Sequence, residues 1–518
     1  MKKLDKKQYF KNEESERGSG VLMHISSLPG PYGIGSMGDK AREFTDFLER
    51  AGQSYWQVLP IGTTSFGDSP YTSFSSYAGN PYFIDLDYLV QEDLLTYEDI
   101  HQHIGHIDDH GKVDYGKLYQ ERYPLLKVAF KNFDSEDRGY FAFTEKHNYW
   151  LRDYALFMTL KEKHNGDKWN NWPNKYKFRD HDALDEFEIE HLDEINFYKF
   201  IQYKFFSQWR KLKKYVNKKH ISIIGDLPIY LAEDSADVWA NPDLFQLNQD
   251  LQPTYVSGVP PDGFSDDGQL WGNPIYDWEE HEATDYEFWI NRVKFNLDIF
   301  DVIRLDHFRG FESFWLVPSN EETAKYGRWE QGPGLKLFDA LFEELGPMRM
   351  IVEDLGYMTD EVYKLRETLG FPSMKVLQFA FNPDATSDYL PHNLSENTVI
   401  YTGTHDNDTI IGWLHHGNPH EIEFAKKYLN ITEEETFNWG LIRGAMTSVS
   451  KLAIFQMQDL LFLGNEARMN CPGTLGQNWQ WRMHEHAIHD DMVHYFRELT
   501  RMSGRIQENN DDEDDENT

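Results

Sequence analysis

Three acidic residues of this 518-residue chain, Asp306, Glu353 and Asp406, each come at or shortly after the end of a short apolar run. Short runs rich in aliphatic and β-branched residues are typical of buried parallel strands. In a (β/α)8 barrel, the residues just past the carboxyl ends of the strands line the active site. We therefore expect the three carboxylates to converge in one pocket and to act as nucleophile, acid or base.

Asp306 belongs to the segment Arg304-Leu305-Asp306-His307. Side chains two positions apart on an extended segment point to the same side, so the guanidinium of Arg304 and the carboxylate of Asp306 can lie next to each other. A neighbouring cation favours the ionised form of an acid, and an ionised carboxylate suits a nucleophile. An ordinary ion pair at the end of a strand is the alternative for these two residues taken alone.

Glu353 directly follows an apolar run, where partial desolvation would help its carboxyl group to hold a proton, as a general acid must. A capping acid before the next helix is the alternative. Asp406 stands in His405-Asp406-Asn407-Asp408, a dense set of donors and acceptors that would also suit a divalent metal. Because all three acids follow runs of one expected barrel, at the end that carries function, the combination favours catalysis.

The expected barrel rests on eight strand-like runs, the number that a closed (β/α)8 barrel needs. They are residues 20–25, 55–60, 221–225, 301–305, 350–352, 375–379, 398–401 and 459–463. Helical patterns at residues 39–51 and 359–369 fit alternating β/α units. We expect the fold class to be α/β, with one TIM barrel over residues 1–518 and no separate C-terminal β domain.

Three segments depart from the repeating unit. Residues 89–194, between the second and third runs, predict an inserted and mostly helical subdomain, because the connection is far longer than an ordinary loop. Residues 256–285 begin with much Gly and Pro, and we expect a long irregular loop that covers the active site. The acidic run within residues 508–518 predicts a disordered tail.

The composition narrows the range of partners. With 51 Lys and Arg against 87 Asp and Glu, the net charge of −36 repels nucleic acid and anionic membranes. Aromatic residues make up 15% of the chain, and they would either stack on sugar rings or fill a large core. Because Cys471 is the single cysteine and no run approaches the ~20 apolar residues of a membrane span, we expect a soluble, cytoplasmic protein.

Short segments spread over nearly the whole chain carry a specific combination of residues. They are Ser19-Gly20-Val21, His24-Ile25-Ser26-Ser27-Leu28-Pro29, Trp56-Gln57-Val58-Leu59-Pro60, Ser69-Pro70-Tyr71, Gly79-Asn80-Pro81, Gly225-Asp226-Leu227-Pro228-Ile229, Gly272-Asn273-Pro274, Arg304-Leu305-Asp306-His307-Phe308-Arg309-Gly310, Glu353-Asp354-Leu355-Gly356, Thr404-His405-Asp406-Asn407, Pro472-Gly473-Thr474 and Asn478-Trp479. The combination resembles the 4-α-glucanotransferase (amylomaltase, disproportionating enzyme) family, which belongs with the α-amylase-like retaining enzymes.

The resemblance implies an enzyme that moves an α-1,4-glucan segment from a donor maltooligosaccharide to the 4-OH of an acceptor glucan or glucose, without a cofactor or a metal. By matching motifs, Asp306 is the nucleophile, Glu353 the acid/base and Asp406 the group that holds sugar hydroxyls, with Arg304 and His405 in support. The substrate-binding residues that it implies are Tyr71, Asp226, Trp271, His307, Asn273 and Ser69.

Three other functions share parts of this pattern. An α-1,4-glucan hydrolase, like an amylase, would use the same acids and differ only in its products. A catalytically silent glucan-binding scaffold would have no need of all three acids. A metal-dependent barrel enzyme would use His307, His405 and Asp408 as ligands and would lose its activity with a chelator.

Overall fold

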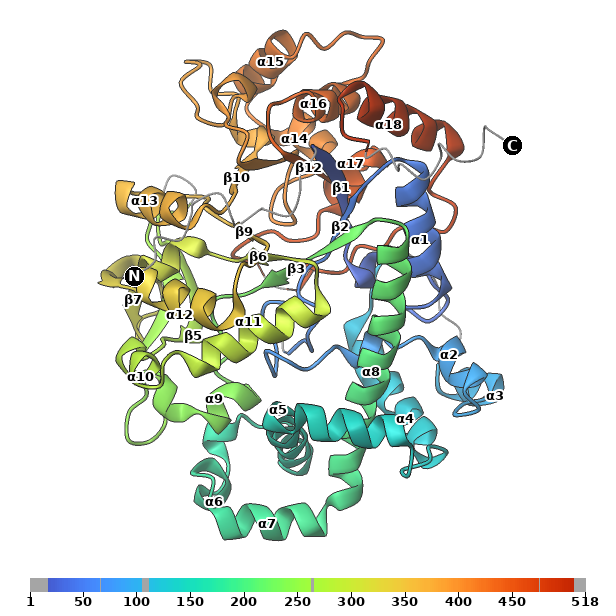
Figure 1. Cartoon of the computed structure of the whole chain (residues 1–518), viewed down its shortest axis with the longest axis vertical. Coiled ribbons are helices and arrows are strands. Elements are labelled where there is room, and N and C mark those ends of the chain that lie inside the picture. Colours follow the sequence, from blue (N-terminus) through green and yellow to red (C-terminus); the bar gives the residue numbers. More distant parts are fainter. Residues whose placement is uncertain (1–16, 66, 105–110, 262–264, 475, 507–518) are drawn as a thin grey trace.

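Eight parallel strands close into a barrel at the centre of the molecule, in the order β1-β12-β11-β10-β9-β6-β3-β2 (Figure 1). The computed structural model describes residues 17–65, 67–104, 111–261, 265–474 and 476–506. The barrel strands are β1 (Gly18–Leu22), β2 (Tyr55–Gln57), β3 (Ser222–Leu227), β6 (Val302–Leu305), β9 (Met350–Val352), β10 (Ser373–Val376), β11 (Thr398–Tyr401) and β12 (Leu452–Gln456). Nearly all of their residues are buried, as expected where side chains fill the interior and helices cover the outside. The (β/α)8 fold expected from the sequence is confirmed.

Amphipathic helices surround the barrel. In α1 (Asp39–Arg50) the buried residues include Phe44, Phe47 and Leu48, and this spacing of three and four places them on one face of the helix. The helical patterns at residues 39–51 and 359–369 are confirmed as α1 and α13 (Asp360–Leu369). The other helices around the barrel are α8 (Leu192–Lys218), α11 (Glu287–Ile299), α12 (Leu335–Leu345), α14 (Ile410–His416), α15 (Pro419–Tyr428), α16 (Phe437–Met446) and α18 (Asp490–Met502). No helix of the described residues is long and apolar enough to cross a membrane.

The connection from β2 to β3 contains a group of helices before α8. They are α2 (Leu86–Gln91), α3 (Tyr97–His103), α4 (Tyr115–Lys131), α5 (Arg138–Lys163), α6 (Asn174–Lys177) and α7 (His181–Glu190). Because α5 packs along α8, which itself contacts β3, this group is continuous with the barrel wall. Trp169 and Trp172 within it are 0% and 3% exposed, so they belong to the core. That residues 89–194 form a subdomain of their own stays a prediction.

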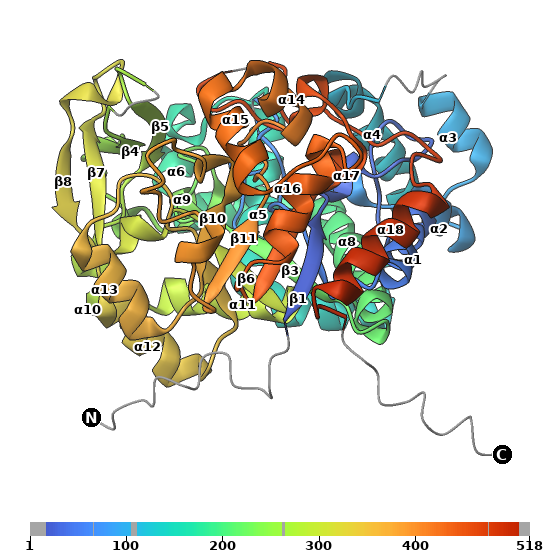
Figure 2. The ribbon, with the colours of Figure 1, turned by 90° about the horizontal axis from the view of Figure 1, so that it is seen from above.

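A second, antiparallel sheet lies beside the barrel in the order β5-β4-β7-β8. Its strands are β4 (Tyr255–Val259), β5 (Gln269–Pro274), β7 (Ser313–Pro318) and β8 (Arg328–Gln331). Figure 2 shows this sheet at one edge of the molecule and α2, α3 and α4 at the opposite edge. Short helices α9 (Ala236–Ala240) and α10 (Trp278–Ala283) lie before β4 and after β5.

The expectation of an irregular loop over residues 256–285 is therefore wrong. The glycine that argued against a strand, Gly258, lies at a shift in the register between β4 and β5. A Cβ atom at this position would come within 2.5 Å of the carbonyl oxygen of Gln269. Glycine here permits a bulge in a paired strand, and a bulge is not a break.

The eighth strand was also misplaced. Residues 459–463 are the end of α17 (Met457–Leu460) and the turn after it, and the strand is β12. The apolar run is nearly continuous from residue 452 to residue 463, so its pattern does not show where a strand ends. Asp459 is fully buried and accepts hydrogen bonds from the Ile410 backbone N–H and the Thr402 hydroxyl. The other seven runs each overlap a barrel strand.

The barrel closes where β1 pairs with β12, and the first pair is Gly18 with Leu452. Arg505, which follows α18, is fully buried beside this seam. Its guanidinium donates hydrogen bonds to the carbonyl oxygens of Gly18 at 2.8 Å, Met446 at 2.8 Å and Ser450 at 2.9 Å. One side chain thus connects the start of the first barrel strand, β1, with the segment that precedes the last one, β12. The predicted tail, residues 508–518, lies outside the described residues.

Candidate active site

Three acids from adjacent strands meet around one guanidinium. Arg304 lies on β6, and its Nη1 is 2.7 Å from Asp226 Oδ2 and 3.0 Å from Asp306 Oδ1. Its Nη2 is 3.3 Å from Glu353 Oε2. Asp226 is on β3, Asp306 directly follows β6, and Glu353 directly follows β9. The structure therefore brings these four predicted residues together at the carboxyl ends of neighbouring strands.

The register of the strands produces the central ion pair. Asp226 on β3 is the partner of Arg304 on β6, and neighbouring residues of parallel strands point to the same side. Their side chains are 0% and 4% exposed, so each must find partners inside the protein. Asp226 also accepts a hydrogen bond of 2.8 Å from the Tyr71 hydroxyl. Burial opposes the charge of Arg304, but the acidic groups around it outweigh burial and raise its pKa.

A strained backbone residue fixes Glu353. The backbone N–H of His307 donates a hydrogen bond of 2.7 Å to Glu353 Oε2. His307 has φ 46° and ψ 51°, the left-handed region that few residues other than glycine occupy. Backbone strain of this kind is found at functional sites, where the surrounding structure maintains it. Here it directs one N–H group at the predicted acid/base.

The ionisation of Asp306 depends on its neighbours. Burial raises the pKa of Asp306 to about 7, Arg304 opposes the rise, and the Glu353 carboxylate adds to it. Burial and the second acid outweigh Arg304, so the pKa of Asp306 moves opposite to the direction that Arg304 alone would give. Asp306 is therefore protonated below about pH 7 and becomes a nucleophilic carboxylate above it, and Arg304 favours that ionised form. The Asp306 side chain is 23% exposed, so a ligand can reach it.

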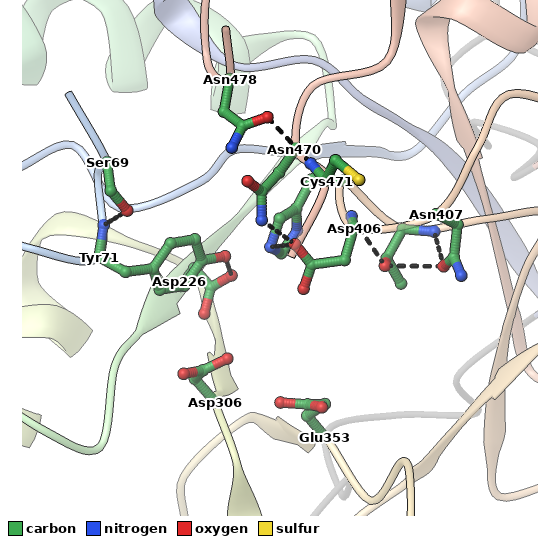
Figure 3. A network of polar contacts seen from close by, with 12 residues as sticks. Ser69, Tyr71, Asp226, Asp306, Glu353, Asp406, Asn407, Asn470, Cys471 and Asn478 are labelled. Atoms are coloured by element: carbon green, nitrogen blue, oxygen red, sulfur yellow. Dashed lines mark hydrogen bonds and ion pairs between the residues drawn. The ribbon is translucent and has the colours of Figure 1, made fainter. Parts of the chain in front are cut away.

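Asp406 faces the carboxyl pair from the other side of the site (Figure 3). It lies on the loop after β11, and its side chain is 44% exposed. Asn470 Nδ2 donates a hydrogen bond of 2.6 Å to Asp406 Oδ1, and Arg468 donates to the Asp406 carbonyl oxygen. His405 Nε2 lies 3.4 Å from the same Oδ1 atom. Loop residues, and no barrel strand, hold this third acid.

A group of rings connects the two sides. The rings of Tyr71 and His405 are stacked, with centroids 5.1 Å apart, and the Trp479 ring lies 5.8 Å from each. The Tyr71 backbone N–H donates to Ser69 Oγ at 3.2 Å, so Ser69 shapes the turn before Tyr71. Burial lowers the pKa of His405, which leaves its imidazole neutral at neutral pH. The Tyr71 hydroxyl and His405 thus link Asp226 to Asp406.

Trp271 and His307 form the part of the site nearest the second sheet. Trp271 on β5 is 38% exposed, and its ring meets the His307 ring edge-on at 4.7 Å. Burial lowers the pKa of His307 to about 3. Asn273 instead donates to the Leu231 carbonyl oxygen and accepts from the Ser257 hydroxyl. Its contacts support the β4–β5 hairpin.

The search for acids in the sequence missed several neighbours of the predicted residues. Asn470, Arg468 and Trp479 surround Asp406 and His405, and Tyr230 lies near Trp271 with ring centroids 6.2 Å apart. Trp479 does occur in one of the segments that carry the family resemblance. Asn470 has no such signal, because an amide becomes informative only when its acidic partner is known.

The residues of the metal-dependent alternative do not meet. His405 contacts Asp406, His307 contacts Trp271, and Asp408 Oδ2 accepts a hydrogen bond of 2.7 Å from Asn465. Within the part of the chain that the structure describes, no three His, Cys, Asp or Glu side chains are arranged to hold a metal ion.

A close pair of carboxyl groups at the end of a barrel, with rings around it, suits the chemistry of glycosidic bonds. The two groups touch the same guanidinium, and retaining enzymes need their two carboxyl groups close together. Exposed and half-buried aromatic rings offer faces to the apolar sides of sugar rings. The fold and the site define a carbohydrate-active barrel enzyme.

Comparison with known proteins narrows this class. The family model described as 4-alpha-glucanotransferase matches residues 23–488. The 4-alpha-glucanotransferase of Clostridium butyricum is 51% identical over 489 residues, which cover 94% of this chain and 100% of that protein. The corresponding protein of Thermus thermophilus is 47% identical over 482 residues, with 91% and 95% covered. The amylomaltase from Streptococcus agalactiae in complex with acarbose has a TM-score of 0.93 at 41% identity, covering 95% of this chain and 100% of that one.

The chain belongs to the 4-α-glucanotransferase family. Its activity is the transfer of α-1,4-glucan segments, the general reaction of that family.

Proposed function

We propose that the transfer is a retaining double displacement in which Asp306 is the nucleophile and Glu353 acts first as acid and then as base. In the first step an Asp306 oxygen attacks the anomeric carbon, the glycosidic bond breaks, and Glu353 gives its proton to the departing oxygen. In the second step the 4-OH of an acceptor displaces Asp306 and loses its proton to Glu353. The α-1,4 bond is thereby restored.

The observation that carries this proposal is the contact of one guanidinium with both carboxyl groups. Arg304 lies 3.0 Å from Asp306 and 3.3 Å from Glu353, and the His307 N–H holds the latter in place. A cation at this position stabilises the single negative charge that the pair carries in each ground state. It remains beside the pair as the charge moves from one acid to the other, so no charge must be repositioned during the reaction.

Four of the remaining predicted residues would contact sugar. Asp406, held by Asn470, would accept hydrogen bonds from sugar hydroxyls, and these strengthen as the ring flattens in the transition state. The Tyr71 ring would pack against the sugar that reacts. Trp271 and His307 lie on the Glu353 side and would contact the acceptor. Maltooligosaccharide donors, glucose as an acceptor and a cytoplasmic location belong to the same proposal.

An activated donor separates the roles of the two acids. Glu353→Gln should slow turnover of maltotriose about 10³-fold or more, because the departing oxygen is no longer protonated. With maltosyl fluoride the leaving fluoride needs no such proton, so the first step should survive. A maltosyl adduct on Asp306 should then accumulate and be visible by intact mass and peptide mapping. Asp306→Asn should lose both reactions.

The matched control is Glu367→Gln, an exposed acid on α13. It should leave both donors unaffected. Equal slowing of both donors by Glu353→Gln, or an adduct on another residue, would refute the assigned roles.

Transfer and hydrolysis are told apart by their products. Incubation with maltotriose should yield glucose together with maltopentaose and longer chains, whereas a hydrolase would yield only glucose and maltose. We further propose that the β4–β5 hairpin, which carries Trp271, favours a sugar over water as the acceptor. Shortening this hairpin should raise the ratio of hydrolysis to transfer, and an unchanged ratio would exclude the idea.

A further inference from the structure

Two exposed aromatic rings flank a buried arginine beside the site. Trp329 on β8 is 36% exposed and Tyr357, in the loop after β9, is 70% exposed. The guanidinium carbon of Arg309 lies 3.6 Å from the centroid of the Trp329 ring and 5.5 Å from that of Tyr357. We call these three residues the aromatic strip. None of them has a role in the mechanism described above.

The rings of the strip are held in place. Arg309 donates a hydrogen bond to the Tyr357 carbonyl oxygen, and Trp315 meets Trp329 edge-on with ring centroids 5.1 Å apart. The Arg309 cation therefore covers one face of the Trp329 ring, and the Trp315 indole covers one edge. The exposed area of Trp329 is then on the opposite face of its ring. A flat apolar face that is fixed in advance binds a ligand at a small cost in conformational entropy.

Two short chain segments connect the strip to the catalytic pair. Arg309 is two residues from His307, whose N–H holds Glu353, and Tyr357 is four residues beyond Glu353. The acid that protonates a glycosidic oxygen lies beside the sugars that leave with that oxygen. Those positions receive the acceptor in the second step. Because both chain segments of the strip run on from the acid/base and its partner, we assign the strip to the acceptor side of the site.

We propose that the aromatic strip is an outer acceptor-side subsite, on which a sugar ring of a long α-1,4-glucan stacks. The proposal rests on the role assigned to Glu353. The C–H face of a glucose unit would cover the open face of Trp329, and Tyr357 would contact the same chain. Such a contact is made only by acceptors long enough to reach β8. The strip therefore sets a preference for long acceptors over glucose.

The test uses maltosyl fluoride as the donor, because fluoride leaves without occupying the acceptor side. For each protein, kcat/KM is measured for glucose and for maltoheptaose as acceptors. In Trp329→Ala the ratio of the maltoheptaose value to the glucose value should fall about fivefold to tenfold. Tyr357→Ala should lower it less, and Trp329→Phe, which keeps a ring, should restore most of it.

The matched control is Tyr119→Ala. Tyr119 is also 70% exposed, but it lies on α4, at the opposite edge of the molecule from β8 (Figure 2). It should leave the ratio unchanged.

An unchanged ratio in Trp329→Ala, or an equal loss for both acceptors, would overturn the proposal. Failure of the assigned catalytic roles would look different, because Glu353→Gln would then form no adduct on Asp306 in the mass experiment with maltosyl fluoride.

Discussion

The two sides of the active site are built in different ways. On one side, Asp226 and Arg304 sit on barrel strands and are 0% and 4% exposed. On the other side, Asp406 sits on a loop, is 44% exposed, and depends on Asn470 from a second loop. Strand residues are fixed by the hydrogen-bonded register of the whole barrel, whereas loop residues are fixed by a few local contacts.

The difference between strand-held and loop-held residues suits two different tasks in catalysis. Making and breaking a bond requires reacting groups within about 0.5 Å of their productive positions. Asp306 and Glu353 directly follow β6 and β9, so the register of these strands holds them in place. Holding sugar hydroxyls requires contacts that adjust as a chain enters and leaves, which a loop permits. We therefore expect substitutions on the strand side to affect both stability and activity, and those on the loop side to affect activity alone.

Removal of the shared cation should have the largest effect. Arg304→Met leaves Asp226 buried without its partner, and breaking a buried ion pair costs about 3–5 kcal/mol. Activity should fall at least about 10³-fold. Denaturant unfolding and kcat/KM for maltotriose measure the two effects. The double variant Arg304→Met, Asp226→Asn should regain stability without activity, and a single variant as stable as the original protein would contradict the comparison.

On the loop side the losses should be smaller and confined to kinetics. Asp406→Asn should lower kcat about 10²-fold, because a neutral amide supports a developing positive charge poorly. Asn470→Ala removes one hydrogen bond to a charged group and should cost about fivefold to twentyfold. Their free energies of unfolding should change little.

A double-mutant cycle sharpens this prediction. Asn470→Ala should have less effect in the Asp406→Asn background if it acts through Asp406. Fully additive losses would mean that Asn470 has a separate role.

The pH profile should report the ionisation of Asp306. Because burial raises the pKa of Asp306 to about 7, its carboxyl group is protonated below that value and ionised above it. Only the ionised form can attack, so kcat/KM for maltotriose should fall about tenfold per pH unit below pH 7. Asp406→Asn should keep this fall. Glu353→Gln, assayed with maltosyl fluoride, should move it to lower pH, because the neighbouring charge that helps to raise the pKa of Asp306 is then absent.

The smallest expected effect is a gain in stability. Asp306 binds its proton more tightly in the folded state than in the unfolded state, where an Asp pKa is about 3.9. Ionisation of Asp306 therefore lowers folded stability as the pH rises from about 4 to about 7. Asp306→Asn removes this penalty. Its Tm relative to the original protein should be higher at pH 8 than at pH 4.5, by about 1–2 °C, and a larger gain at pH 4.5 would contradict the sign.

The strand side of the site was the predictable one. Arg304 and Asp306 are two positions apart, and Glu353 ends an apolar run, so local sequence places all three where the structure has them. The partnership of Asp226 with Arg304 depends on the register between strands, to which a single run of sequence does not point. The resemblance to a family implies Asp226 only as a substrate-binding residue and does not indicate this partnership.

The rest depended on contacts between distant segments. Asn470 approaches Asp406 from 64 positions away, and nothing in the polar turn around it indicates an acidic partner. The Gly and Pro content of residues 256–285 predicts a loop, because glycine occurs both in bulges and in breaks, and Gly258 lies at a bulge. For β12, apolar residues continue on both sides of Gln456, so the pattern leaves the position of the strand open between residues 452 and 463.

Closure of the barrel at Arg505 has a consequence for the order of events in a cell. The first strand pairs with the last, and the guanidinium that bridges them comes from a residue 487 positions after Gly18. A ribosome releases the chain from its amino end, so one edge of β1 has no partner strand until β12 has been made, and the seam lacks its bridging guanidinium until Arg505 follows. During that interval its unpaired side is a site for wrong pairing with other chains. Yield in expression should therefore be more sensitive to Arg505→Ala than catalysis by the folded enzyme.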